Sequence, residues 1–157
     1  MISQSQLYRL NYQPEALEEI LEKVPADLSE KKILVGKWSI QENLGHLLRY
    51  QEMSLIRFKR ILNEQEPLLD RYIAEEDEQF NTVLNQSSKK IFIQLKEGRQ
   101  PFTAYLLSLI KEDLSRRGIH PVLGKMALSE WIEFFLLHES HHMMTIFKLA
   151  HSHSTIS

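Results

Sequence analysis

The sequence of 157 residues contains no cysteine. This absence excludes disulfide bonds, thiolate metal sites and cysteine nucleophiles. Glycine and proline are also scarce, with five of each. Long stretches lack the alternation of apolar and polar residues that is typical of β-strands. We therefore expect a helical protein, and a chain of this length fits a single domain over residues 1–157.

The chain also lacks a strong charge imbalance and a long apolar run. Its 19 basic and 21 acidic residues give a formal net charge of −2, which is no signature of nucleic-acid or membrane binding. Charged residues or histidines interrupt each apolar stretch well before the roughly 20 residues that span a bilayer. Residues 1–6 lack the apolar segment of a secretory signal. We expect a soluble, cytoplasmic protein.

Apolar residues at helical spacing predict four long helices. Their expected ranges are 14–24, 39–63, 87–114 and 128–150, with a short extra helix at 5–10. The second helix starts with a capping box, in which Ser39 and Glu42 each accept a hydrogen bond from the other's backbone N–H. The third contains Pro101, yet its apolar register continues past the proline, which predicts one kinked helix.

The connections between these helices differ in length. Residues 66–85 form a long connection that contains the acidic run Glu75 to Glu78, whereas residues 116–125 are expected to form a loop. Long connections are uncommon and often functional, so this one is expected to cover a site. The expected fold class is all-α, a four-helix bundle with a long connection between the second and third long helices.

Histidine is the residue that the composition leaves to explain, because four of the seven histidines lie between His138 and His151. His138 and His142 are four residues apart, which places both rings on one helix face, one turn apart. They share an apolar stripe with Trp131 and Phe135. Two buried imidazoles need hydrogen-bond partners or a metal, and this spacing can chelate one divalent ion. The alternative is a chance pair that binds no metal.

Helical phase leaves the third ligand open. It places His46 on the flank of the second helix, which favours a partly exposed residue, and His120 in a loop ranks near it. His141 is a less favourable partner for His138 than His142 is. His151 and His153 lie in an expected tail, where surface histidines are the rule.

Carboxylates offer another source of ligands. Glu139, Glu42, Glu52 or the acidic run could bind the ion or accept the second N–H of a ligating histidine. For the acidic run, a solvated surface is the more common outcome.

Two motifs carry a family resemblance. Trp38-Ser39, Glu42 and His46-Leu47 resemble the Trp-Ser-x-x-Glu-x-x-x-His-Leu signature of the DinB/YfiT-like superfamily of metal-binding four-helix bundles. His120-Pro121 with Gly124, followed by His138-Glu139 and His142, is similar to that family's His-Pro-x-x-Gly loop and His-Asp/Glu-x-x-His helix. The resemblance extends from about Leu10 to Ala150, which is nearly the whole chain.

The resemblance implies a three-histidine site formed by His46, His138 and His142. Nickel or zinc is the usual ion in the family, with water at the open positions. Activities assigned within the family include thiol-dependent transferases, such as bacillithiol S-transferases and mycothiol-dependent isomerases. Many members have no known activity.

Three function hypotheses follow. The first is a metal-dependent enzyme acting on a small molecule, either through a low-molecular-weight thiol co-substrate or by hydrolysis. Tyr50, Glu139 and Glu42 are its candidate orienting or proton-handling groups, although a structural role is commoner for such residues. The second is a non-enzymatic metal-containing or stress-related binding bundle. The third is a structural bundle with an accidental histidine cluster. We also expect a homodimer.

Overall fold

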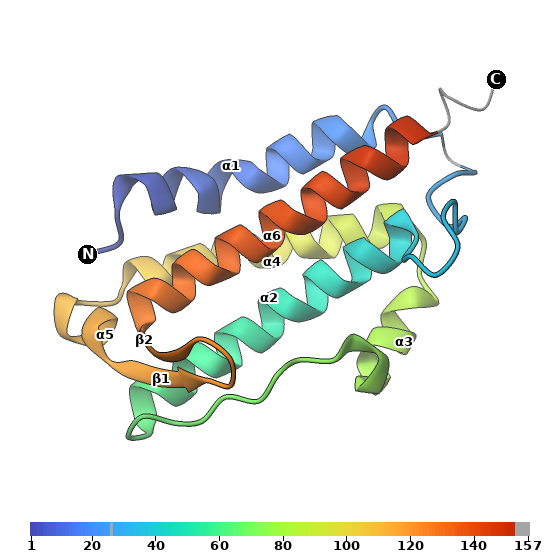
Figure 1. Ribbon diagram of the computed structural model, residues 1–157. Coiled ribbons are helices and arrows are strands. Elements are labelled where there is room, and N and C mark those ends of the chain that lie inside the picture. The colour runs from blue at the N-terminus through green and yellow to red at the C-terminus, as the bar shows by residue number, and fades with distance from the viewer. Residues whose placement is uncertain (26, 153–157) are drawn as a thin grey trace.

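Four long helices run side by side along the molecule (Figure 1). In this computed structural model, residues 1–25 and 27–152 are described. The long helices are α1 (Gln4–Leu21), α2 (Ile40–Asn63), α4 (Ser88–Leu107) and α6 (Leu128–His151). The connection between α2 and α4 contains only the short helices η1 (Ala74–Glu76) and α3 (Glu78–Leu84). The expected all-α bundle with a long second connection is therefore confirmed.

Helix α1 is longer at its start than the sequence predicted. The expected short helix at 5–10 and the separate helix from Pro14 are wrong, because one helix begins at Gln4, continues through Pro14 and ends at Leu21. Proline lacks the N–H that would bond the carbonyl four residues earlier. Here that carbonyl belongs to Leu10, and it accepts a hydrogen bond from Nη1 of Arg99 on α4 at 3.3 Å. A side chain from another helix thus replaces the missing backbone donor.

Helix α4 continues through Pro101, as predicted, but it ends at Leu107 rather than at 114. Ile110 adopts an extended conformation, and its N–H donates to the carboxylate of Asp113 at 3.0 Å. This bond starts a separate short helix, α5 (Lys111–Ser115). The apolar periodicity beyond 107 therefore belongs to two helical segments and not to one.

The predicted loop at 116–125 is wrong, because the segment forms a β-hairpin. Strands β1 (Arg117–His120) and β2 (Gly124–Ala127) pair antiparallel, with His120 opposite Gly124. Gly124 has a φ of +76°, which side-chain-bearing residues rarely adopt. The hairpin also holds the long connection, because the N–H of Leu69 donates to the carbonyl of Ile119 at 3.0 Å. Helix α6 follows at Leu128, with Ala127 at its N-cap.

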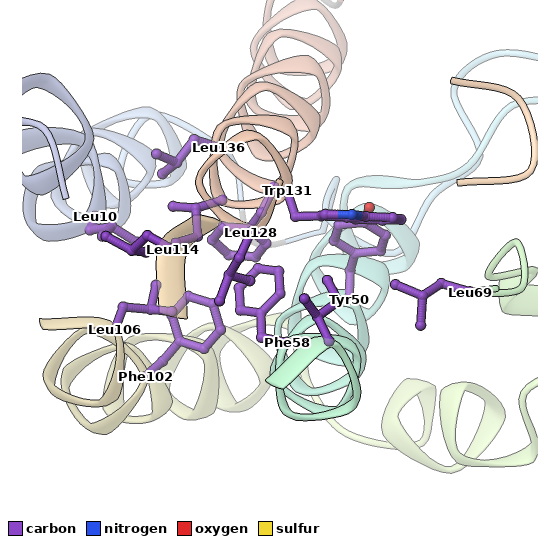
Figure 2. Close-up of a cluster of buried hydrophobic side chains, with 13 residues drawn as sticks. Leu10, Tyr50, Phe58, Leu69, Phe102, Leu106, Leu114, Leu128, Trp131 and Leu136 are labelled. Carbon is purple, nitrogen blue, oxygen red and sulfur yellow. The ribbon is translucent and has the colours of Figure 1, made fainter. Parts of the chain in front are cut away.

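A large apolar cluster joins all four long helices. Leu10 of α1, Phe58 of α2, Phe102 of α4 and Trp131 of α6 all belong to it, and Figure 2 shows Trp131 extending over Tyr50 toward Leu69. Burying a large apolar side chain stabilises a fold by about 1.5–3 kcal/mol. Leu69, from the long connection, belongs to the same cluster, so the connection is fastened to the bundle. Among the described helices, none combines the length and apolar character needed to cross a membrane.

Candidate metal centre

Three histidines converge between helices α2 and α6. His46 comes from α2, His138 and His142 come from α6, and one ring nitrogen of each lies within 4.8 Å of the others. The Nε2 atoms of His46 and His138 are 3.1 Å apart. Two nitrogens bound to a tetrahedral zinc at 2.0–2.1 Å would lie about 3.3 Å apart. The spacing therefore fits two ligands of a single ion.

His46 is buried, with only 6% of its surface exposed. Helical phase predicted that His46 is partly exposed on the flank of α2, and this prediction is wrong. Helix α6 and the long connection cover this flank, and neither can be placed from the periodicity of α2. Neighbouring Asn43 and Tyr50 are buried on the same flank.

Asn43 orients His142. The Oδ1 atom of Asn43 lies 2.8 Å from Nδ1 of His142, and Nδ2 of Asn43 donates to the backbone carbonyl of Ser39 at 2.8 Å. Because the amide oxygen can only accept, Nδ1 of His142 carries the proton. The lone pair of Nε2 is then free for an ion, the arrangement that supports many metal-binding histidines.

The other two histidines have an unsatisfied atom each. In the described part of the chain, Nδ1 of His46 and Nδ1 of His138 are buried without a hydrogen-bond partner. An unsatisfied buried polar group costs about 1–3 kcal/mol. Metal bonds at Nε2 would not satisfy these Nδ1 atoms; the fit to a divalent metal rests instead on the Nε2 atoms, which face each other at a spacing that suits one shared ion.

Burial keeps all three histidines neutral. It lowers the pKa of His46 to about 4, and the charge of Glu75 opposes part of this shift. Burial, together with the neighbouring histidines, lowers the pKa of His142 to about 3 and that of His138 to about 2. A neutral imidazole is the form that binds metal, so the site is ready for an ion at neutral pH.

Aromatic rings surround the three histidines. The ring of Tyr50 stacks on that of His138, with centroids 3.7 Å apart. Trp38 lies over His46 at 4.9 Å, and Tyr72 stacks on the same ring at 5.4 Å. These contacts restrict the histidine rings. The sequence offered a signal for Trp38, which precedes the capping box, but none for Tyr72.

The histidines line a cavity of about 470 Å³ between α2, α6, the hairpin and the long connection. Small-molecule sites commonly have volumes of roughly 300–1,000 Å³. Residues 71–75 of the connection form one wall of the cavity. The long connection therefore covers the cavity of the candidate site.

The acidic run has several separate roles. Glu75, Glu76 and Glu78 are all exposed, and Glu75 is the one of the three that lines the cavity. Asp77 accepts hydrogen bonds from Nε of Arg49 at 2.8 Å and from the hydroxyl of Tyr72 at 2.9 Å. Asp77 thus ties the cavity wall to α2.

Glu139 and Glu42 do not line the cavity. Glu139 is 2% exposed and forms a buried ion pair with Arg99 of α4, which also donates to Oε1 of Gln51 at 2.6 Å. Glu42 caps the start of α2 and pairs with Lys32 at 3.0 Å. Glu52 pairs with Arg49. Tyr50 is the one sequence-predicted candidate for orienting or proton handling that lines the cavity.

The remaining histidines lie outside the cluster. His120 lines the cavity, but its Nδ1 accepts hydrogen bonds from the N–H groups of Val122 and Leu123 at 3.1 and 3.0 Å. His141 is exposed, with its ring edge against His142. His151 ends α6 and is exposed, so the predicted tail begins later than expected. His153 lies outside the described residues.

A model of the DinB superfamily matches residues 9–146. Relatives from Bacillus cereus (strain 03BB102) and Bacillus anthracis (strain CDC 684 / NRRL 3495) are each named "Putative metal-dependent hydrolase". Each is 28% identical to this chain over 142 residues, which are 86% of this chain and 80% of the relative.

Two solved structures from Bacillus subtilis share the fold. YfiT, described as "a probable metal-dependent hydrolase with an unusual four-helix bundle topology", has a TM-score of 0.81 at 22% identity, covering 98% of this chain and 91% of YfiT. The DinB-like protein YjoA has a TM-score of 0.64 at 16% identity, covering 96% of this chain and 92% of YjoA. At these identities the likeness concerns the fold.

Proposed function

The chain belongs to the DinB superfamily, and on this basis we propose that it is a metal-dependent enzyme that hydrolyses a small molecule. One observation carries the proposal: three neutral histidines from two helices, with ring nitrogens within 4.8 Å of one another, line a cavity of small-molecule size. Three protein ligands leave a position open, as in catalytic zinc sites. A divalent ion held there would lower the pKa of a bound water and polarise a substrate oxygen.

Other side chains would hold and shield the reacting groups. Asn43 orients His142, and the rings of Trp38, Tyr50 and Tyr72 exclude water from the sides of the histidine cluster. Glu75 is the one carboxylate on the cavity wall in the described ranges. We assign it the role of proton acceptor, since hydrolysis requires a base near the attacking water.

The metal and the reaction type are finer parts of the proposal. Three imidazole nitrogens suit both zinc and nickel, and we propose one of these two ions. A low-molecular-weight thiol co-substrate could occupy the same open position, which would make the protein a thiol transferase. The relatives described above are named as hydrolases, which favours hydrolysis. A non-enzymatic metal-containing bundle remains the alternative that the activity assay must separate.

Two further proposals concern the state of the protein. We propose a homodimer, because Leu137, Met144 and Phe147 are exposed apolar residues along α6. A protein that sediments as a monomer at micromolar concentration would contradict the homodimer.

We also propose a cytoplasmic location, on the sequence arguments given above.

The decisive experiment measures metal and activity together. Tag-free protein purified without chelator should contain about one zinc or nickel per chain by mass spectrometry. His138→Ala should bind the added ion at least about tenfold more weakly, whereas the exposed His151→Ala should not.

Activity should follow the metal. Panels of ester and amide substrates should be hydrolysed, and a chelator should abolish this activity and added metal restore it. Parallel assays with a thiol and an electrophile test the transferase alternative. A protein without stoichiometric metal, whose affinity for added zinc or nickel is unchanged by His138→Ala, would refute the proposal.

A further inference from the structure

Arg57 is a buried cation beside the histidine cluster. It comes from α2, is 8% exposed and lines the cavity. Its Nη2 atom donates to the backbone carbonyl of Asp70, and its Cζ atom lies 5.7 Å from the ring centre of Tyr50. None of the ion pairs found in residues 1–25 and 27–152 includes Arg57. Its charge is therefore buried without a carboxylate partner.

A buried charge without a counter-charge is costly. Arginines are usually retained in such positions with a carboxylate or phosphate as partner, because the five N–H donors of the planar guanidinium suit these groups. The carbonyl of Asp70 and the hydroxyl of Tyr50, which also interacts with this side chain, use only part of this donor capacity. Because Arg57 lines the cavity, its remaining donors are available to a ligand bound there.

His120 adds a second donor to the same cavity. Its Nδ1 accepts two backbone N–H bonds, from Val122 and Leu123, so this nitrogen carries no proton. The ring must then carry its proton on Nε2. Trp131 and Phe134 hold the ring at centroid distances of 5.4 and 5.2 Å. His120 is thus a fixed N–H donor on the hairpin wall of the cavity.

The charges that line the cavity favour an anion. Arg57 and Arg71 are positive and Glu75 is negative. Arg57 and His120 are close enough for the guanidinium charge to add to burial in lowering the pKa of His120. Glu75 acts on His46, and Arg57 also acts on His138, where its charge adds to burial in lowering the pKa. Both signs of charge therefore reach the histidine cluster, but two arginines against one carboxylate leave the cavity lining net positive, and a bound divalent ion would increase that excess.

We propose that Arg57 and the Nε2–H group of His120 form an anion-binding pole, and that the molecule processed at the histidine cluster carries a small oxyanion such as a carboxylate or phosphoryl group. The inference rests on the proposed function, because it names the substrate class of that site. The histidines would handle the reactive end of the substrate, and this pole would hold its charged end.

Nuclear magnetic resonance of the zinc-loaded protein tests the inference. The reporters are the Nε–H of Arg57 and the backbone amides of Val122 and Leu123, which bond His120. Titration with propionate should shift all three signals in a saturable way, whereas the neutral analogue propionamide should not. A parallel titration with inorganic phosphate distinguishes the two anion types: saturation by phosphate indicates a phosphoryl group, and saturation by propionate alone indicates a carboxylate.

Matched variants locate the binding. Arg57→Gln should weaken propionate binding about tenfold or more, as expected for a lost charged hydrogen bond. Arg60→Gln removes a partly exposed arginine of the same helix that pairs with Glu64, and should leave the affinity unchanged. His120→Asn keeps a side-chain acceptor for the Val122 and Leu123 amides but loses the Nε2 donor, so it should also weaken binding.

Several results would overturn the inference. One is equal binding of propionate and propionamide, and another is unchanged propionate affinity in a folded Arg57→Gln variant. If Arg57→Gln does not fold, unchanged affinity in His120→Asn overturns it instead. The same titration of chelator-treated protein separates the two proposals. Anion binding there without any metal affinity would refute only the metal-dependent function, while metal binding without selective anion binding would refute only the pole.

Discussion

Asn43 is a residue whose side chain acts on the candidate metal centre without lining its cavity. It is 1% exposed, and its amide connects the ring of His142 to the carbonyl of Ser39, next to the N-terminus of α2. The capping box of Ser39 and Glu42 fixes that carbonyl. The proton position on His142 therefore depends on a local motif at a helix start.

Replacing Asn43 should consequently weaken metal binding. Asn43→Ala removes the acceptor for Nδ1 of His142, and loss of such a partner typically lowers metal affinity about 10- to 100-fold. Competition with a chromogenic chelator measures the change. Asn63→Ala, at the exposed end of the same helix, serves as the control. Equal zinc or nickel affinity in both variants would contradict the assigned role.

At the scale of helices, the pair Arg99–Glu139 joins the whole bundle. Arg99 of α4 contacts Glu139 of α6, Gln51 of α2 and the carbonyl of Leu10 in α1. Glu139 lies next to His138 in the chain, yet its side chain makes this ion pair in the bundle interior. The acidic residue that follows the first histidine is thus structural. It holds α6 in place relative to the other helices.

Breaking this pair should destabilise the protein strongly. Glu139→Ala leaves the buried guanidinium without its counter-charge, which typically costs 3–5 kcal/mol, so we expect a loss of about that size in the free energy of unfolding. Urea denaturation of the metal-free protein measures it. The double variant Arg99→Met with Glu139→Leu should recover part of the loss, because it leaves no unpaired charge but removes the donor to the Leu10 carbonyl and to Gln51. A single variant as stable as the parent would show that the pair contributes little.

For the whole molecule, the neutral histidines make stability depend on pH. In an unfolded chain histidine has a pKa of about 6.5, while burial lowers the values to about 4 for His46, 3 for His142 and 2 for His138. Below pH 6.5 the unfolded state therefore binds more protons than the folded state. The free energy of unfolding is at its full value above about pH 6.5 and falls as pH decreases toward these lower values.

The metal-free protein should thus lose stability between pH 7 and pH 5. Each such histidine adds a slope of up to about 1.4 kcal/mol per pH unit below its unfolded pKa. Urea denaturation of chelator-treated protein across this range measures the total slope. His138→Ala should make the slope shallower, and His151→Ala should not. Identical slopes in the parent and in His138→Ala would mean that His138 is not held neutral by burial.

Local patterns predicted the parts of this molecule that depend on neighbouring residues. Apolar spacing predicted the four long helices, the capping box at Ser39 marked the start of α2, and the spacing of His138 and His142 placed two ligands on one face. These features need only the 3.6-residue period of the helix. Predictions failed at Pro14 and at the 117–127 hairpin because contacts with Arg99 and with the long connection decide the local conformation there.

The complete site depends on contacts between residues far apart in the chain. Periodicity left His46 on an exposed flank, and only the family resemblance joined it to the pair on α6. In the structure, α6 and residues 71–75 cover that flank and bury the ring. The same packing brings Arg57 and His120 to one cavity, which no pattern in the sequence indicated. The sequence by itself therefore determined the helices and the histidine pair. The tertiary structure decided the third ligand and the cavity, because helical phase describes one helix and not what packs against it.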